Sequence, residues 1–188
     1  RYIAMITGLT IVSAAAVTVA GVVDRYQLRR IDAFLNQDSN ERDLQQIVLQ
    51  VRFAKRAVSS GGFFGKGFLQ GPLTNGAFIP VQFSDFPFSA IGEQFGMIGG
   101  FVVLALFAII LWRLWVIARL ARTRFDQLLI AGVFSLLLFQ IFQNIGMTLG
   151  LTPVSGLPLP FISYGGSHLV SSALMIGLAQ SIYMRRLR

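Results

Sequence analysis

The sequence predicts an all-α integral membrane protein, a polytopic helical bundle with four transmembrane helices in this chain and one long extracytoplasmic loop. Hydrophobic residues make up 54% of the 188 residues and charged residues only 13%. Because a soluble domain carries about 25% charged residues, this composition favours a membrane protein. The second observation is that four apolar stretches are long enough to cross a bilayer, and the third is that basic residues cluster beside them.

The four predicted spans follow from the need for about 20 apolar residues to cross the hydrocarbon core. The last span is short, and we expect it to recruit part of the polar stretch 163–168 that precedes it. The spans are Ile3–Val23, Met97–Ile117, Leu128–Leu149 and Leu169–Tyr183.

The basic clusters predict the orientation of these spans. They comprise Arg1, then Arg113, Arg119, Arg122 and Arg124, and finally Arg185, Arg186 and Arg188. Short basic loops stay in the cytoplasm, so both ends of the chain lie inside, and segments 24–96 and 151–167 face outward. The net charge of +8 therefore reflects topology. A nucleic-acid partner is not predicted, because it would need a basic face on a soluble fold.

The long segment 24–96 contains one predicted amphipathic helix, Asp43–Val58. Its apolar residues recur at helical spacing, and Ser59–Gly62 ends it. The residues on the predicted apolar face are Leu44, Ile47, Val48, Val51 and Ala54.

Asp85 is the candidate catalytic residue. It stands among Phe83, Phe86 and Phe88 at the edge of the second span, and a poorly solvated carboxylate is a stronger base. The alternative is structural, since Ser84 or Asp85 could cap a helix that begins at Phe86. The two roles are compatible.

The segment Gly156–Ser167 breaks the hydrophobic sequence with two prolines, three glycines and two serines. Irregular backbone at membrane depth is tolerated only where it is buried in protein or lines a cavity, so we expect this segment to shape a site. Ser163 and Tyr164 within it are candidate substrate-binding residues. Polar Gln140, Gln143 and Asn144 in the preceding span are predicted to hydrogen-bond within the bundle.

Two residue counts limit the chemistry. The chain has no cysteine, which excludes disulfides and thiolate catalysis, and His168 is the only histidine. One histidine cannot build a metal site or a catalytic triad by itself.

Three motifs resemble the SEDS family, the polytopic glycosyltransferases that polymerise bacterial peptidoglycan. The segment 144–167 resembles the family's C-terminal motif. Gly62–Gly67 resembles a glycine-rich segment with one lysine. Pro80, Asp85, Phe86, Phe88 and Glu93 match a third motif, from which the chain departs at Val81, Phe83, Ser84 and Gln94. The resemblance covers nearly all of residues 1–188, which would be the C-terminal portion of a SEDS membrane domain with the last four of its ten helices.

The resemblance implies a function and a set of site residues. It implies a peptidoglycan glycosyltransferase that polymerises lipid II into glycan strands at the outer face of the bacterial cytoplasmic membrane, for elongation or division, with a lean toward the RodA branch. Asp85 would be catalytic. Lys66, Glu93 and Arg29 would join Ser163 and Tyr164 in binding substrate. Glu93 could equally mark only where the second span emerges.

The resemblance also implies partners. They are lipid II, membrane lipids and a class B penicillin-binding protein, the transpeptidase partner of the family. The leaving pyrophosphate needs positive charge, which Lys66, an arginine or a divalent cation such as Mg²⁺ or Mn²⁺ could supply. Without the six other helices of the family, this chain alone is expected to be inactive. A lipid flippase and a non-catalytic scaffold of the elongation or division machinery are the alternative functions.

Overall fold

The computed structural model describes residues 25–35, 45–76 and 82–186. The chain divides into two compact units, Arg1–Val48 and Leu49–Arg188, which are described separately. Within the described residues every regular element is a helix. The all-α prediction is therefore confirmed for this part of the chain.

The first unit contains α2 (Arg25–Leu35) and the beginning of α3 (Gln45–Ser60). Ala33 of α2 and Val48 of α3 are buried together, with Ile47 packed against them. The predicted span Ile3–Val23 lies outside the described residues.

The second unit begins within α3, whose existence the apolar spacing predicted. The helix ends at Ser60, as the Ser59–Gly62 stretch indicated. Ala54 and Ala57 on one face of α3 are fully buried against Phe86 and Met147. Two short helices follow, α4 (Pro72–Asn75) and α5 (Gln82–Asp85). The long loop is thus largely helical where it is described.

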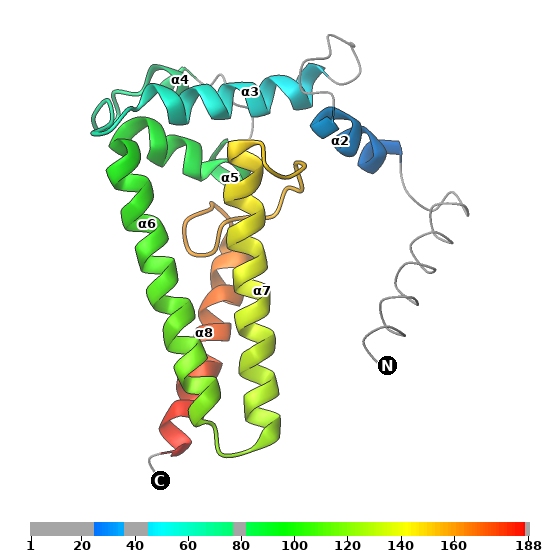
Figure 1. Ribbon diagram of the computed structural model, residues 1–188, viewed down its shortest axis with the longest axis vertical. Helices are drawn as coiled ribbons and strands as arrows, with labels where there is room; N and C mark the ends of the chain where they lie inside the picture. The colour runs from blue at the N-terminus through cyan, green and yellow to red at the C-terminus, as the bar shows by residue number, and fades with distance from the viewer. Residues whose placement is uncertain (1–24, 36–44, 77–81, 187–188) are drawn as a thin grey trace. The chain divides into compact units, whose positions relative to one another are not determined.

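Three long helices complete the second unit (Figure 1): α6 (Pro87–Leu120), α7 (Arg124–Leu149) and α8 (Gly166–Arg186). Of the helices in the described ranges, α6 and α7 are long and apolar enough to cross a membrane. Helix α8 recruits residues 166–168 as expected but is more polar, because it carries His168, Gln180 and several serines. Its role as a span stays a prediction.

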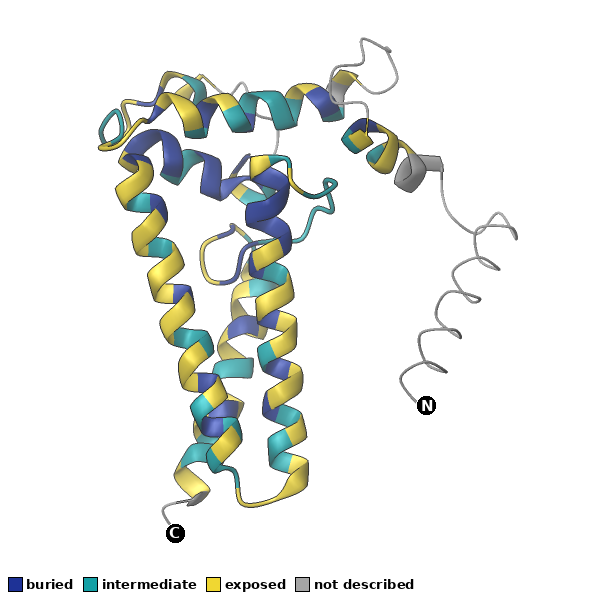
Figure 2. Ribbon diagram, viewed as in Figure 1, coloured by how far each residue is buried: buried dark blue, intermediate teal, exposed yellow. Residues whose placement is uncertain are grey.

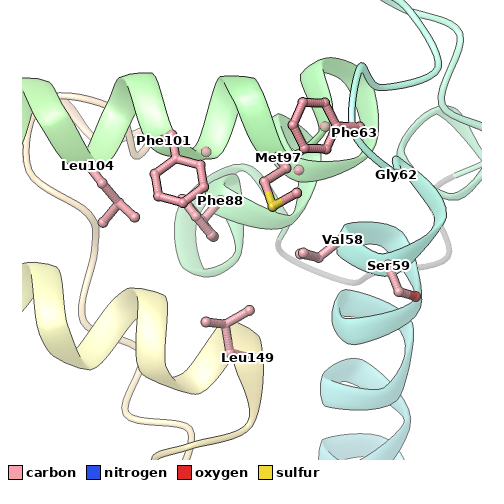
Figure 3. Close-up of a pocket in the computed structure, with 12 residues that line it drawn as sticks. Val58, Ser59, Gly62, Phe63, Phe88, Met97, Phe101, Leu104 and Leu149 are labelled. Atoms are coloured by element: carbon pink, nitrogen blue, oxygen red, sulfur yellow. The ribbon is translucent and has the colours of Figure 1, made fainter.

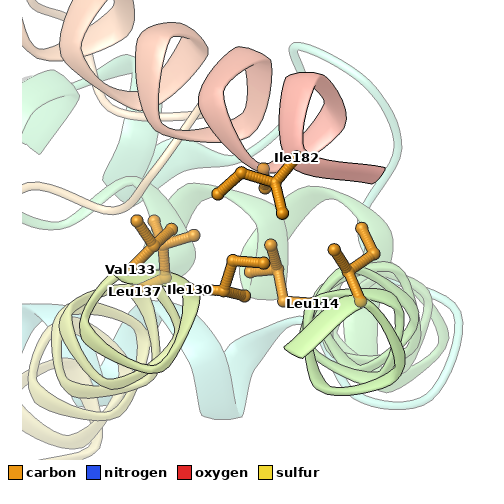
Figure 4. Packing of buried hydrophobic residues seen from close by; sticks show 7 residues of the cluster. Leu114, Ile130, Val133, Leu137 and Ile182 are labelled. Carbon is orange, nitrogen blue, oxygen red and sulfur yellow. The ribbon is translucent and has the colours of Figure 1, made fainter. Parts of the chain in front are cut away.

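The three helices pack through one apolar cluster (Figure 4). It unites Leu114 and Ile117 of α6, Ile130, Val133 and Leu137 of α7, and Ala179 and Ile182 of α8. The outer faces remain apolar and exposed along α6 and α7 (Figure 2), as at Phe101, Trp112 and Phe142. Large exposed apolar surface is typical of helices that meet lipid or other helices.

The turn between α6 and α7 places the arginines at one end. Thr123 caps α7, since its side chain accepts a hydrogen bond from the Asp126 N–H. This turn and the C-terminal end of α8 lie at the same end of the three helices (Figure 1), so Arg122 and Arg185 share that end. The arrangement agrees with the orientation that the basic clusters predict.

Candidate functional site

Asp85 is the last residue of the one-turn helix α5, and it does not cap α6. The N-cap of α6 is Phe86, which makes no side-chain hydrogen bond, and Pro87 occupies the first helical turn. The prediction that Ser84 or Asp85 caps this helix is therefore wrong. A polar cap would accept from the N–H of the second or third helical residue, but here the Ser89 N–H donates to the Phe86 backbone carbonyl at 3.1 Å.

The turn that carries Asp85 is held through its backbone carbonyls. The Phe86 N–H donates to the Gln82 carbonyl at 3.1 Å, and the Tyr164 N–H donates to the Phe83 carbonyl at 2.9 Å. The Asn144 side-chain amide donates to the Asp85 carbonyl at 2.9 Å. The last carbonyls of a helix have no partner inside the helix, so here other segments provide the donors.

The Asp85 carboxylate itself is uncommitted. Its residue is half-buried, between Phe86, which is buried, and Phe83, which is exposed. No hydrogen bond or ion pair joins this carboxylate to any residue in the described part of the chain. A fixed backbone with a free acid group is what a general base requires.

The segment between α7 and α8 enters the bundle. Leu159 is fully buried against Phe107 of α6 and Ile141 of α7, and Phe161 lines a cavity with Ile109 of α6. Figure 1 shows the segment turning back between the two helices. Leu159, Pro160 and Ser163 of this segment are buried, whereas Phe161, Ile162 and Tyr164 are exposed; we call residues 151–165 the re-entrant segment, and its expected role in shaping a site stays a prediction.

The two site candidates in the re-entrant segment differ. Ser163 is buried, and its hydroxyl oxygen accepts a hydrogen bond from the Leu159 N–H at 2.7 Å. Tyr164 is 83% exposed, and only its backbone is tied, to Phe83. The structure thus gives Ser163 a turn-forming contact and leaves the Tyr164 ring available to a ligand.

Helix α6 is broken at Gly96, whose φ and ψ are 64° and −157°. The break frees backbone groups that the glycine-rich segment 61–67 satisfies. Met97 and Ile98 N–H donate to the Gly62 and Phe63 carbonyls at 2.9 and 3.3 Å. Lys66 and Gly67 N–H donate to the Glu93 and Gln94 carbonyls, both at 3.0 Å. The segment is therefore docked on α6, which the sequence did not indicate.

Glu93 is fully buried in the first part of α6. Its carboxylate accepts hydrogen bonds from the Leu73 N–H at 3.1 Å and the Thr74 N–H at 2.7 Å, and also from the Thr74 hydroxyl. Lys66 Nζ lies 3.4 Å from the same carboxylate. Protein donors thus occupy Glu93, which fixes the loop 66–76 to α6.

Gln94 stands where the resembled motif has a second glutamate. Its side-chain oxygen accepts a hydrogen bond from the Leu69 N–H at 3.2 Å, and the residue is buried. An amide oxygen accepts as a carboxylate oxygen does. The departure from the motif therefore keeps the contact.

The side-chain ammonium group of Lys66 remains accessible to a ligand. Its backbone N–H and that of Gly67 bind α6, and the Gly65 N–H donates to the Gly61 carbonyl at 2.8 Å. Protein carbonyls therefore already accept from these three backbone N–H groups. The ammonium group, with its side chain 32% exposed beside Glu93, is what remains to meet negative charge.

The candidate residues form two groups in the second unit. Asp85, Ser163 and Tyr164 meet where α5 contacts the re-entrant segment, whereas Lys66 and Glu93 meet at the break in α6. Residues 87–92 of α6 connect the two groups. Arg29 lies on α2 in the first unit, so its place in the site stays a prediction.

An apolar groove of about 580 Å³ is lined by residues of α3, α6 and α7 and of the glycine-rich segment (Figure 3). Figure 3 shows Phe88, Met97 and Phe101 of α6 facing it, with Leu149 of α7 and Val58 of α3 on its other sides. Its lining is almost wholly hydrocarbon. Such a groove suits an extended apolar chain.

Comparison with known proteins decides the family. A family model described as "Cell cycle protein", which covers FtsW, RodA and SpoVE, matches residues 1–187. The chain belongs to the FtsW/RodA/SpoVE family.

Curated members of this family match most of the chain. The peptidoglycan glycosyltransferase MrdB of Escherichia coli is 36% identical over 162 residues, which are 86% of this chain and 43% of MrdB. The peptidoglycan glycosyltransferase RodA of Treponema pallidum is 35% identical and covers 88% of this chain and 38% of RodA. Stage V sporulation protein E of Bacillus subtilis is 34% identical over 84% of this chain and 42% of that protein. The chain thus spans about two fifths of the length of these relatives.

Two solved structures share the fold. A chain of a peptidoglycan synthase complex, described as coordinating polymerization and crosslinking, aligns with a TM-score of 0.74 at 26% identity. It covers 96% of this chain and 48% of that one. A mutant of the rod shape determining protein RodA of Thermus thermophilus aligns with a TM-score of 0.53, also at 26% identity. This alignment covers 88% of this chain and 60% of the RodA chain. The helical arrangement is therefore that of the FtsW/RodA/SpoVE family.

The sequence did not predict that Asn144 contacts Asp85. The prediction that Gln140, Gln143 and Asn144 hydrogen-bond within the bundle is confirmed for two of them, since Gln143 donates to the Pro153 carbonyl at 2.9 Å and Asn144 to Asp85 and Leu157. The buried Gln140 Oε1 atom, in contrast, has no hydrogen-bond partner in the described part of the chain. The link to Asp85 spans 59 positions. A side-chain amide within a predicted span indicated a hydrogen bond, but the sequence does not indicate which residue accepts it.

Proposed function

We propose that the protein is a peptidoglycan glycosyltransferase that polymerises lipid II into glycan strands at the outer face of the bacterial cytoplasmic membrane. Family membership and the names of the relatives support this proposal. The single observation that carries it is the Asp85 carboxylate, which no described residue binds while its backbone is held from two sides.

The proposed reaction joins two lipid-linked sugars. The 4-hydroxyl of the acceptor attacks the anomeric carbon of the donor, and Asp85 takes the proton of that hydroxyl. The new C–O bond forms as the bond to the donor phosphate breaks, and undecaprenyl pyrophosphate leaves with the electron pair. General-base catalysis of this kind contributes about 10²–10⁴-fold to the rate.

The leaving pyrophosphate needs positive charge near it. Lys66 is one candidate, because its ammonium group is partly exposed and Glu93 orients it. A divalent cation such as Mg²⁺ or Mn²⁺ is another. No group of three His, Cys, Asp or Glu residues could hold a metal ion in the ranges that the structure describes. Because Mg²⁺ usually binds one or two carboxylates together with substrate phosphates, a cation stays a proposal, and no step is assigned to one.

The apolar groove supports the lipid-linked nature of the substrate. Its lining by Phe88 places it next to the turn that follows Asp85, and Met97 places it next to the break near Lys66. An isoprenoid chain in this groove would bring the pyrophosphate to which it is attached toward both groups of site residues. Burial of each CH₂ group contributes about 0.8 kcal/mol, so even partial occupation would favour binding.

A class B penicillin-binding protein is the proposed partner. The solved structure of a peptidoglycan synthase complex, to one chain of which this fold is similar, supports an assembly that combines polymerization with crosslinking. Glycan strands that are made outside must also be crosslinked outside. A partner with transpeptidase activity would supply that crosslinking.

The test is polymerisation of radiolabelled lipid II by the complete natural protein. Asp85→Asn removes the base and keeps the size of the side chain. We expect the rate to fall by about 10²–10⁴-fold, with normal membrane insertion. Retention of more than about a tenth of the rate would reject the role of Asp85.

Asp126→Asn is the matched control. It makes the same chemical change at the other end of the bundle, where Asp126 contacts only the Thr123 cap among the described residues. This variant should polymerise near the wild-type rate. If the wild-type protein moves lipid II across vesicles without polymerising it, the protein is a transporter instead.

A further inference from the structure

We infer that Asn144 is the positioning residue of this site. It ties the turn that carries Asp85 to the re-entrant segment and so determines where the Asp85 carboxylate stands. This inference rests on the proposed function for its catalytic consequence, but its geometric part can be tested without it.

The first evidence is a double hydrogen bond. Asn144 Nδ2 donates to the Asp85 carbonyl at 2.9 Å and to the Leu157 carbonyl at 2.8 Å. Both partners can only accept, so the NH₂ group must face them. One side chain therefore uses both of its N–H donors to join α5 to the re-entrant segment.

The second evidence is what Asn144 leaves unpaired. The residue is fully buried, and among the residues that the structure describes its Oδ1 atom has no hydrogen-bond partner. A buried acceptor without a partner destabilises the fold and calls for an explanation. An apolar residue would avoid that cost if the position served packing alone. The free-energy cost of the unpaired oxygen is explained if the two donated hydrogen bonds position the site.

The third evidence is that α5 cannot hold Asp85 by itself. It has only four residues, Gln82–Asp85, and an isolated turn of helix is unstable. The other external bond to α5 comes from the backbone N–H of Tyr164, which nearly any residue would supply. Asn144 is the side chain that hydrogen-bonds the Asp85 backbone within the described residues.

The consequence for catalysis follows from distance. A general base must lie within about 2.6–3.2 Å of the hydroxyl whose proton it takes. A displacement of about 1 Å can lower the rate about 10²-fold. Loss of the Asn144 contacts should therefore slow the chemical step and leave the affinity for the lipid-linked substrate nearly unchanged.

The experiment compares variants of the complete protein in kcat and KM for lipid II. Asn144→Leu removes both donors, and Asn144→Asp keeps the size of the side chain while losing its NH₂ group. We expect kcat to fall at least about tenfold for Asn144→Leu, with KM changed less than about threefold. The kcat of Asn144→Asp should also be lower than that of the wild type. Gln140→Leu is the matched control, because it is one turn away on α7 and has no hydrogen bond to α5 or to the re-entrant segment.

A second measurement reports the geometry directly. The chain has no cysteine, so in a background without other thiols Ser84→Cys reports the exposure of the α5 turn to an impermeant maleimide. Asn144→Leu should speed labelling, and Gln140→Leu should not. Equal labelling in the two variants, or equal kcat, would overturn the inference. If the wild type does not polymerise lipid II, the proposed function fails, yet the labelling still decides whether Asn144 holds this turn.

Discussion

Gly96→Ala is the substitution whose effect the structure defines best. A Cβ atom at this position would lie 2.7 Å from the Phe63 carbonyl oxygen and closer still to the Gly65 backbone nitrogen. Both are backbone atoms that cannot rotate away. The φ and ψ of 64° and −157° belong to a region that only glycine readily adopts. The variant must therefore either strain the break or straighten α6.

Either route undocks the glycine-rich segment 61–67. Backbone strain of this kind costs about 1–3 kcal/mol. Straightening α6 would return the Glu93 and Gln94 carbonyls to the helix and so remove their bonds from Lys66 and Gly67, each worth about 0.5–1.5 kcal/mol. A total near 3 kcal/mol raises the open fraction of this segment about 100-fold.

Amide hydrogen exchange of the complete protein in detergent measures that fraction. Peptides that cover residues 61–76 should exchange about 100-fold faster in Gly96→Ala. Gly132→Ala is the control, because a Cβ atom at Gly132 in α7 meets nothing within 4 Å, and alanine stabilises a helix by up to about 1 kcal/mol relative to glycine. Unchanged exchange of segment 61–76 in Gly96→Ala would refute the assigned role of the break.

Other predictions test the loop, the orientation and the partner. Glu93→Gln leaves one acceptor oxygen for the several donors of loop 66–76. Docking of the loop should lose about 1.5–3 kcal/mol of free energy, so protease should cut the loop faster, and unchanged digestion would contradict this. In intact cells, a thiol in place of Gln70 should react with an impermeant reagent and one in place of Arg122 should not, whereas labelling of the latter would reverse the orientation. Affinity purification in mild detergent should recover a class B penicillin-binding protein, and its absence would count against the partnership.

The parts of the fold that follow local patterns could be predicted. Apolar spacing predicted α3, apolar length predicted α6 and α7, and prolines and glycines indicated the re-entrant segment. The choice of Asp85 as the candidate catalytic residue rests on its aromatic neighbours and the family motif, and it stays a prediction. These features depend on residues that are close in sequence.

The features that were missed depend on distant segments. Docking of segment 61–67 at Gly96 pairs backbone groups about 30 positions apart, and backbone groups are the same in every residue. The glycines at Gly61, Gly65, Gly92 and Gly96 were the available signal, because two backbones that approach closely need small residues on both sides. The predicted cap of α6 was wrong because the Phe86 backbone carbonyl, which no side chain indicates, accepts the Ser89 N–H.

The break at Gly96 also has a consequence for how the protein fits the thickness of its bilayer. Between Gly96 and Arg113, α6 has 16 uncharged residues, Met97–Trp112, which span about 24 Å at 1.5 Å each. The hydrocarbon core of a typical bilayer is about 30 Å thick, so we expect the lipid to thin around α6 or Arg113 to extend its side chain to the interface. Thinning would draw phosphate headgroups toward the N-terminal end of α6, which follows Asp85 in the chain. Reconstitution in lipids of increasing chain length should therefore slow polymerisation, and a rate independent of chain length would show that the mismatch is absorbed by Arg113 alone.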